Sequence, residues 1–175
     1  MDRKIVVFCS SSYDIDTAYN EAARDFVRGV CAKDYTIVSG GAIKGMMGVV
    51  SETVFECGGR HKGVMPRFMT QYIYPHLTET VWTDTMSERK ERMREGTCAA
   101  VALPGGIGTM DELFETHVLS KLGQYDGKIY ALNINGFYDP LKALLESFVE
   151  TKMTTREDVD RLVFCDSVEE LLKHF

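Results

Sequence analysis

The chain has 175 residues, 45% of them hydrophobic, which is enough to bury a core and predicts one domain over residues 1–175. Its formal net charge of −6 argues against DNA or RNA as a partner, because a polyanion usually needs a basic surface that displaces counterions. The apolar run before Ser10 is too short for a signal peptide, and no run approaches membrane-spanning length. We therefore expect a soluble cytoplasmic protein with no nucleic-acid or membrane partner.

The cysteines and histidines also indicate the cytosol, and they indicate no metal site. The five cysteines form no CxxC pair and their number is odd, which is typical of reduced and mostly buried thiols in the cytosol. The four histidines are scattered and have no metal-ligand spacing. The sequence predicts no metal site and no cofactor.

Short β-branched runs alternate with longer segments of helical periodicity along the chain. The strands predicted from these runs cover residues 4–10, 36–41, 61–66, 79–84, 99–105, 128–134 and 161–167. The helices predicted between and after them cover residues 16–32, 45–57, 87–96, 109–122, 139–151 and 168–174. Continuous apolar strands joined by helices favour a parallel sheet covered on both faces. The predicted fold class is α/β, a doubly wound sheet of about seven strands.

Three of the predicted strands end in small and polar residues. In a doubly wound sheet the ligand site lies at the carboxyl ends of the strands. Bare amides and hydroxyls at the start of the following helix favour an anion there, and phosphate is the obvious candidate. One such loop alone is more often a tight turn, whereas three that converge favour a site. The loops are Cys9 to Ser12, Ser39-Gly40-Gly41, and Pro104 to Thr109, and none has the Walker or GxGxxG spacing.

Glu112 has two interpretations. Thr109 and Glu112 have the spacing of a capping box, in which a threonine at the N-cap and a glutamate three residues later satisfy helix amides. That structural role explains Glu112 without catalysis. Alternatively, a carboxylate one turn from a phosphate loop is placed to act on the group that the phosphate esterifies. Glu115 shares the same helix face.

The charged segment 86–95 also has two interpretations. Alternating charges are typical of a solvated helix with pairs such as Glu88–Arg92. The helix begins near the carboxyl end of the fourth strand, however, so Arg89 is placed to project over the same crevice. The planar guanidinium of arginine suits phosphate oxygens.

The segments GGAIKGMMGVVSETVFECGG, ERKERM and LPGGIGTMDEL, in this order and spacing, resemble the LOG (LONELY GUY) family of phosphoribohydrolases, long labelled as lysine decarboxylases. The resemblance implies a Rossmann-like homodimer, with its active site near the interface, that hydrolyses the N-glycosidic bond of a nucleoside 5′-monophosphate. The products are a free base, such as adenine or a cytokinin, and ribose 5-phosphate. It implies that Arg89 and Glu112 are catalytic and that Gly105, Gly106, Gly108 and Thr109 hold the phosphate. The further candidates for substrate contact are Ser10, Ser11, Gly40, Gly41, Met86, Lys90, Ile107 and Glu115.

Several alternatives accompany this resemblance. No lysine is marked by its neighbours as a Schiff base, which argues against the decarboxylase label. A nucleotide-binding or carrier protein without catalysis is the alternative function, because fold alone does not decide activity. Segment 66–80 is predicted to form a lid or dimer-facing loop, with residues such as Met65, Phe68 and Tyr74 belonging either to that face or to the core. His117 is expected to pack its helix rather than contact substrate.

Overall fold

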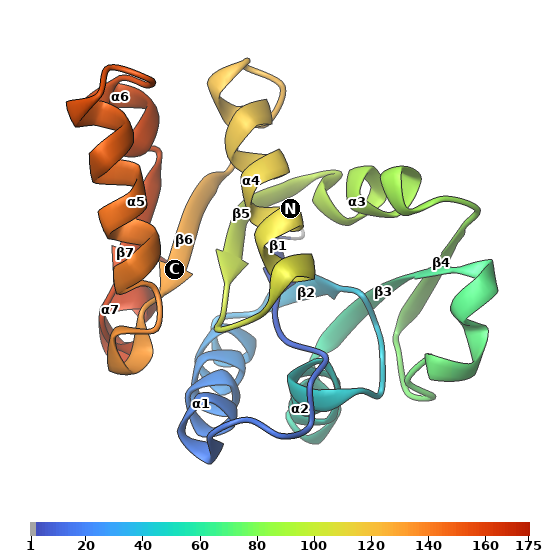
Figure 1. Cartoon of the computed structure of the whole chain (residues 1–175). Coiled ribbons are helices and arrows are strands. Elements are labelled where there is room, and N and C mark those ends of the chain that lie inside the picture. The colour runs from blue at the N-terminus through green and yellow to red at the C-terminus, as the bar shows by residue number, and fades with distance from the viewer. Residues whose placement is uncertain (1–2) are drawn as a thin grey trace.

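The β-branched runs pair into one parallel sheet in the structure, a computed structural model that describes residues 3–175 (Figure 1). The first two residues of the predicted domain lie outside the described residues. The spatial order of the strands is β4-β3-β2-β1-β5-β6-β7, and every neighbouring pair is parallel. The predicted doubly wound α/β fold with seven strands is confirmed. The strands are β1 (Arg3–Phe8), β2 (Tyr35–Ser39), β3 (Arg60–Pro66), β4 (Glu79–Thr83), β5 (Thr97–Ala102), β6 (Lys128–Leu132) and β7 (Leu162–Cys165).

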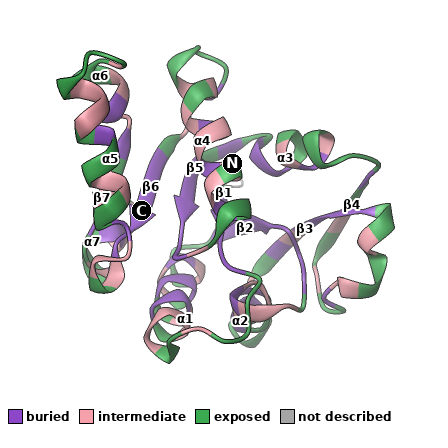
Figure 2. Cartoon of the chain, viewed as in Figure 1, coloured by how far each residue is buried: buried purple, intermediate pink, exposed green. Residues whose placement is uncertain are grey.

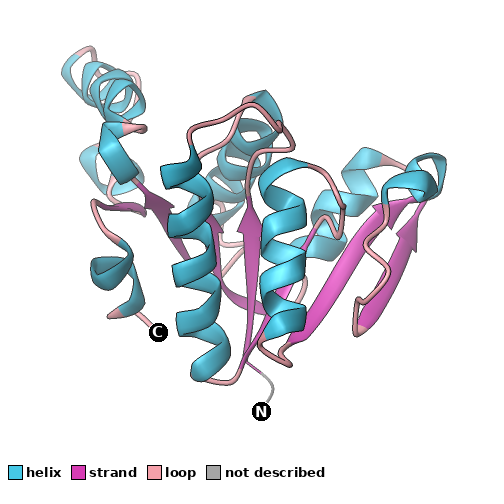
Figure 3. Cartoon of the chain, turned by 90° about the horizontal axis from the view of Figure 1, so that it is seen from below, coloured by secondary structure: helices cyan, strands magenta, loops and turns pink. Residues whose placement is uncertain are grey.

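Helices cover both faces of this sheet, so the central strands are buried between two apolar layers (Figures 2 and 3). One layer is packed by α1 (Thr17–Ala32), α2 (Gly45–Glu56) and α7 (Val168–Leu172). The other is packed by α3 (Met86–Arg94), α4 (Ile107–Lys121), α5 (Asp139–Glu150) and α6 (Arg156–Val159). The short 3-10 segments η1 (Arg67–Tyr72) and η2 (Ile134–Gly136), like α6, were not among the predicted elements.

Side-chain caps explain where several helices start. The carboxylate of Asp16 accepts a hydrogen bond of 2.9 Å from the amide of Ala18, at the start of α1. The hydroxyl of Thr85 accepts one of 3.1 Å from the amide of Glu88, at the start of α3. Glu88 itself accepts from the amide of Asp84 at 2.9 Å, so its carboxylate secures the helix start instead of forming the predicted pair with Arg92.

The strand order reverses between β1 and β5, which are hydrogen-bonded neighbours. From β1 the chain runs outward to β4, and it then returns through α3 to β5 on the other side of β1. The loops that follow β1 and β5 therefore diverge and leave a crevice at their carboxyl ends. The fold places the predicted ligand loops at this switch point.

The five cysteines are free thiols that lie either in one apolar layer, the one packed by α1, α2 and α7, or at the surface. Cys9 and Cys165 are buried, Cys31 is half-buried, and Cys57 and Cys98 are exposed. The prediction of mostly buried thiols is therefore wrong. Short apolar runs had suggested burial, but Cys98 lies at an exposed position of β5. Among residues 3–175, no helix combines the length and the apolar character that crossing a membrane needs.

Candidate active site

A cleft of about 370 Å³ opens at the switch point, above the carboxyl ends of the strands. Its walls come from the loops after β1, β2, β3 and β5 and from helices α3 and α4. Within residues 3–175, no group of three or more histidine, cysteine, aspartate or glutamate side chains is placed to hold a metal ion. Polar residues from four segments line the cleft: Ser10, Ser11, Ser12, Lys44, Arg89, Thr109, Asp111 and Glu112.

The start of α4 supplies backbone amides to this cleft. The helix begins at Ile107, with Gly106 as its N-cap, and no side chain caps it. The first amide in its own ladder is that of Met110, which donates to the carbonyl of Gly106 at 3.0 Å. The amides of residues 107–109 therefore precede the ladder and lie at the positive end of the helix dipole. This arrangement can bind an anion such as a phosphate.

The predicted capping box at Thr109 and Glu112 is wrong. Because α4 begins two residues before Thr109, the threonine lies inside the first turn and not at the N-cap. Its side chain is buried, 3% exposed, and packs against Gly105, where a Cβ would overlap it. The early start moves Glu112 into the second turn, so its carboxylate is not used to cap the helix.

Arg89 reaches the cleft from α3 and is 7% exposed. Its Nε donates to the carbonyl of Val64 at 3.0 Å, which fixes the guanidinium beneath the cleft. Gly40 lies against this group, and a Cβ at that position would overlap the guanidinium. The Nη1 atom lies 3.8 Å from Oε1 of Glu112, at the outer limit of an ion pair. Glycine at position 40 therefore makes room for the arginine.

Burial changes the acidity of Glu112. Its side chain is 13% exposed, and removal from water raises the pKa of the carboxyl group from 4.5 to about 7. The positive charge of Arg89 acts in the opposite direction and limits that rise. Burial also lowers the pKa of Arg89, while Glu112 opposes the change. Near neutral pH the cleft thus holds a carboxyl group close to its own pKa beside a buried cation.

Other charged side chains of α3 and α4 pair with each other at the edge of the cleft, whose lining includes Asp111. Lys90 Nζ lies 3.0 Å from Asp111 and 3.1 Å from Glu115, and Arg94 lies 2.9 Å from Glu115. These three ion pairs join the two helices. The interpretation of α3 as a solvated charged helix therefore fails for Lys90 and Arg94, whose side chains are largely buried against α4.

The cleft brings most of the predicted site residues together and excludes four. The lining includes Ser10, Ser11, Gly40, Met86, Arg89, Gly106, Ile107, Gly108, Thr109 and Glu112. The residues that lie outside it are Gly41, Lys90, Gly105 and Glu115.

Each of the four excluded residues has a structural contact. Lys90 and Glu115 belong to the ion pairs between α3 and α4. Gly41 has φ of +65° and donates its amide to Ser39 Oγ, and Gly105 supports Thr109. Substrate contact by any of the predicted residues stays a prediction.

The cleft is also lined by Ser12, which belongs to the predicted loop after β1, and by Met69 and Tyr72, from the segment predicted as a lid or dimer-facing loop. Sequence reasoning missed Lys44, which lines the cleft as well. Of the residues proposed for a lid or dimer-facing surface, Met65 at the end of β3 and Tyr74 are buried, and Phe68 is 61% exposed. His117 contacts the backbone carbonyl of Asp158 at 2.6 Å, as expected for a packing histidine.

Comparison with known proteins identifies the family. The model of the family described as "Possible lysine decarboxylase" matches residues 47–175. A cytokinin riboside 5′-monophosphate phosphoribohydrolase of Arabidopsis thaliana is 35% identical over 151 residues, which cover 85% of this chain and 70% of that protein. The enzyme of that name from Mycobacterium tuberculosis is 32% identical over 177 residues, 98% of this chain and 92% of that one. The chain belongs to the LOG family.

Solved structures share the fold of this LOG-family chain at low sequence identity. The molybdenum cofactor binding protein of Rippkaea orientalis has a TM-score of 0.76 and 15% identity, over 99% of this chain and 95% of that one. The molybdenum cofactor carrier protein of Chlamydomonas reinhardtii has a TM-score of 0.75 and 17% identity, over 99% and 96%. These similarities confirm the Rossmann-like architecture.

Proposed function

We propose that this LOG-family protein hydrolyses the N-glycosidic bond of a nucleoside 5′-monophosphate, of the AMP or cytokinin riboside monophosphate type, to a free base and ribose 5-phosphate. The observation that carries the proposal is the pairing of Glu112 with Arg89 in the same cleft as the amides at the start of α4. An anion site alone requires only the amides. A buried carboxyl group with a raised pKa beside it suits chemistry on the bound ligand.

The amides of residues 107–109 are the proposed phosphate ligands. The phosphate does not react, so its binding positions the sugar and lets remote binding energy act on the bond that breaks. Ser10 and Ser11, at the end of β1 and on the adjoining wall, add hydroxyl groups to the same end of the cleft. The ribose then extends from α4 toward Arg89 and Glu112.

Ionised Glu112 acts at the anomeric carbon. When the C1′–N bond breaks, its electron pair leaves with the base and the sugar gains oxocarbenium character. A carboxylate nearby stabilises that positive charge and orients the attacking water, whose oxygen bonds to C1′ and whose proton balances the charge of the departing base. Arg89, bound to the carbonyl of Val64, keeps the carboxylate ionisable despite its burial.

A homodimer is a further part of the proposal. Helix α4 and its C-cap residue Leu122 present exposed apolar side chains: Ile107 is 90% exposed, Val118 53% and Leu122 61%. Ile107 also lines the cleft, so a second copy on this surface would lie beside the active site. Light scattering coupled to size exclusion measures the assembly, and a monomer at micromolar concentration would contradict this part.

The cytoplasm is the proposed compartment of the reaction. All five cysteines are free thiols in the structure, including Cys57 and Cys98 at the surface. Exposed thiols of this kind stay reduced in a cytosolic environment. Fractionation with an antibody to the protein tests the location.

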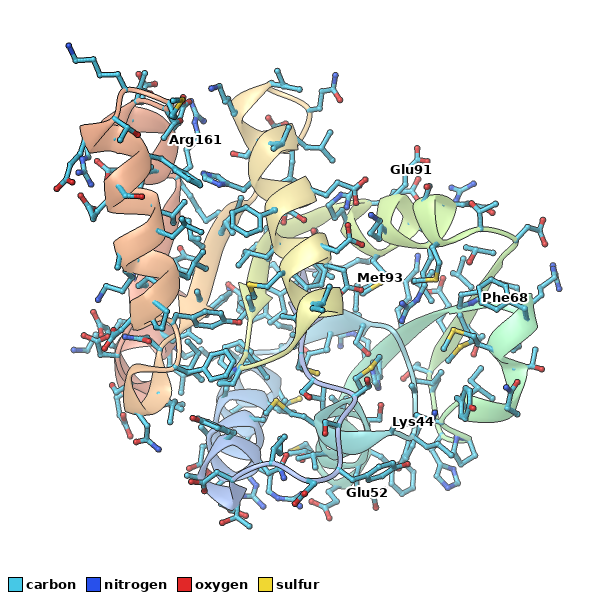
Figure 4. All side chains as sticks on the ribbon, viewed as in Figure 1. Lys44, Glu52, Phe68, Glu91, Met93 and Arg161 are labelled. Carbon is cyan, nitrogen blue, oxygen red and sulfur yellow. The ribbon has the colours of Figure 1, made fainter. Side chains whose placement is uncertain are left out.

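Incubation of the purified protein with AMP, followed by chromatography for free adenine, tests the activity. Glu112→Gln should abolish the release of adenine and leave AMP binding largely intact. Glu91→Gln is the matched control, because Glu91 projects from the outer side of α3 away from the cleft (Figure 4). A wild-type protein that binds AMP but never releases base would be a nucleotide-binding or carrier protein instead.

A further inference from the structure

The segment that follows β6, residues 133–138, carries side chains that the catalytic scheme above does not use. Strand β6 lies between β5 and β7 in the sheet (Figure 1). The hydroxyl of Tyr138 donates a hydrogen bond of 2.7 Å to the carbonyl of Leu103, the residue after β5. Leu103 leads directly into residues 104–109, called the phosphate loop below because they contain the proposed phosphate ligands. A buried phenol thus contacts the backbone at the point where this loop departs from the sheet.

The hydrogen bond from Tyr138 replaces one that the sheet does not make. In a regular parallel ladder, a residue whose amide donates to the neighbouring strand also accepts a hydrogen bond from that strand. The amide of Leu103 donates to the carbonyl of Phe8 at 2.9 Å, but the amide of Ser10 donates to the carbonyl of Pro104 at 3.3 Å. The ladder therefore passes over the carbonyl of Leu103, a fully buried residue. A buried carbonyl needs a donor, and the Tyr138 hydroxyl supplies it.

Tyr138 is held inside the apolar layer that α3 to α6 pack. It is 2% exposed, and its ring lies edge-on to that of Phe137, with centroids 4.9 Å apart. Burial raises the pKa of the Tyr138 hydroxyl above its ordinary value, and the thiol of Cys9 acts in the same direction. The hydroxyl therefore stays protonated at neutral pH and remains a donor. Tyr138 does not line the cleft, so it acts through the backbone of Leu103 and not on the ligand.

Asn133 fixes the backbone of Tyr138 in turn. It is buried after the end of β6, and its side-chain carbonyl accepts a hydrogen bond of 2.6 Å from the amide of Tyr138. Its Nδ2 donates to Asp139 at 2.9 Å and to Asp166 at 2.8 Å. Its own amide donates to the carbonyl of Cys165 at 2.7 Å. The ends of β6 and β7 and the start of α5 therefore form one hydrogen-bonded unit that places the Tyr138 hydroxyl.

Two further contacts hold the phosphate loop. The amide of Ser10 binds the carbonyl of Pro104, and the side chain of Thr109 packs against Gly105. The carbonyl of Leu103 belongs to the peptide group that joins it to Pro104, whose ring fixes φ. A rotation of that peptide group is therefore passed on to the glycines that follow, whose backbone has little resistance to it.

We propose, on the basis of the function above, that Tyr138 is a positioning residue: by holding the carbonyl of Leu103, it keeps the amides of residues 107–109 aligned for the 5′-phosphate. Phosphate affinity then depends on a hydroxyl group that never contacts the ligand. Arg89 is held by the carbonyl of Val64 on β3 instead, so it does not depend on Tyr138. Ligands that carry the phosphate should lose affinity when the hydroxyl is removed, whereas the same nucleoside without phosphate should not.

The test compares Tyr138→Phe with the wild type, using AMP, ribose 5-phosphate and adenosine. Titration calorimetry measures the affinity for each compound, and steady-state kinetics measure KM and kcat for AMP. In Tyr138→Phe we expect about 10-fold weaker binding of AMP and of ribose 5-phosphate, the equivalent of one hydrogen bond, and unchanged binding of adenosine. KM for AMP should rise by a similar factor, while kcat and its pH dependence stay close to those of the wild type.

Tyr125→Phe is the matched control. Tyr125 is 8% exposed and belongs to the same apolar layer as Tyr138, and its hydroxyl lies 3.0 Å from Oγ1 of Thr97. It does not line the cleft. This variant also loses a buried phenol hydrogen bond, so its stability should fall as that of Tyr138→Phe does. Its affinity for AMP and ribose 5-phosphate should remain that of the wild type.

Three results would overturn the role of Tyr138. One is a Tyr138→Phe variant that binds ribose 5-phosphate as tightly as the wild type. Another is an equal loss of affinity in Tyr125→Phe, since a general loss of stability would then explain both. The third is an equal loss for adenosine, which would show that Tyr138 supports the whole cleft. A wild type that binds ribose 5-phosphate but releases no adenine from AMP would contradict the proposed hydrolysis alone, and weaker binding by Tyr138→Phe would still support the positioning role.

Discussion

Two segments share the pattern Thr-Met-x-Glu, residues 85–88 and residues 109–112, and the structure uses them differently. In the first, Thr85 is the N-cap of α3 and its hydroxyl accepts from the amide of Glu88. In the second, Thr109 lies inside the first turn of α4 and no side chain caps the helix. A capping pattern therefore predicts a cap only where the residues before it cannot continue the helix.

The residues before the two patterns explain the difference. Asp84 precedes the first pattern and its amide donates to Glu88, which closes the turn at that point. Gly106, Ile107 and Gly108 precede the second, and their backbone enters the helix two residues earlier. The shift leaves the amides of residues 107–109 without side-chain caps and places Glu112 at the cleft. The second segment thus exchanges the stability of a cap for an anion site and a buried carboxyl group.

The largest effect that separates the two segments is on turnover. Glu112→Gln removes the carboxylate proposed to stabilise the developing positive charge, and we expect a loss of about 10³-fold in kcat, within the range seen for positioned acid–base groups. Glu88→Gln is the matched control, because glutamine also satisfies the third position of a capping box. Steady-state kinetics with a purine nucleoside 5′-monophosphate measures both. Equal activity in the two variants would place the chemistry elsewhere.

The same substitution at Glu112 that lowers turnover should raise stability, whereas Glu88→Gln should leave stability unchanged. The folded-state pKa of Glu112, about 7, lies above its ordinary value of 4.5, so the fold favours the neutral form. Its contribution to stability is present below pH 4.5 and is lost as the pH rises through 7. At pH 8 Glu112→Gln should therefore be more stable than the wild type by up to roughly 3 kcal/mol, the equivalent of that pKa shift.

Denaturant unfolding at pH 4.5 and pH 8 measures this difference. The advantage of Glu112→Gln should close at the lower pH, and Glu88→Gln should show none at either. A constant advantage at both values would show that packing, and not charge burial, determines the difference.

The pH dependence of activity follows from the same shift. The reaction needs ionised Glu112, so kcat/KM should rise by a factor of about ten per pH unit below the pKa and level off above about 7. The substrate phosphate titrates near pH 6, so its ionisation also bends the pH profile of kcat/KM. The carboxyl carbon resonance of Glu112, absent in Glu112→Gln, identifies its pKa directly. A carboxyl group that titrates near 4.5 would show that the cleft does not desolvate it.

The sequence was sufficient for the fold because the signals are local. Most strands are short apolar runs, and α1 and α5 have clear apolar stripes, so the alternation of strands and helices and the parallel sheet could be predicted, although the order of the strands could not. Arg89 and Glu112 could be found because motifs mark them. The start of α4 could not, since glycine permits either a turn or a helix start, and the choice depends on the packing of Thr109 against Gly105.

Contacts between distant segments were beyond sequence reasoning for a different reason. The pairing of Lys90 with Asp111 and Glu115 joins two helices whose relative placement only the tertiary structure supplies. Lys44 is a single lysine in a glycine-rich loop and had no signal of its own. Its position in the cleft depends on backbone bonds to Tyr72 and Tyr74, more than 25 residues away. The roles of charged residues that contact distant segments in this way can be identified only from the structure.

The smallest effect concerns the cap itself. Thr85→Ala removes the hydroxyl that accepts from the amide of Glu88, and we expect it to destabilise the protein by about 1 kcal/mol, the usual cost of losing an N-cap. Thr85→Ser keeps the hydroxyl and should cost much less. Because Arg89 follows this cap in α3 and its charge lowers the pKa of Glu112, fraying of that turn should also raise KM and raise the pKa of Glu112 further. Denaturant midpoints and KM for the three proteins test both expectations. If Thr85→Ala unfolds at the wild-type midpoint, the cap contributes nothing and the contrast between the two Thr-Met-x-Glu segments would rest on Glu112 alone.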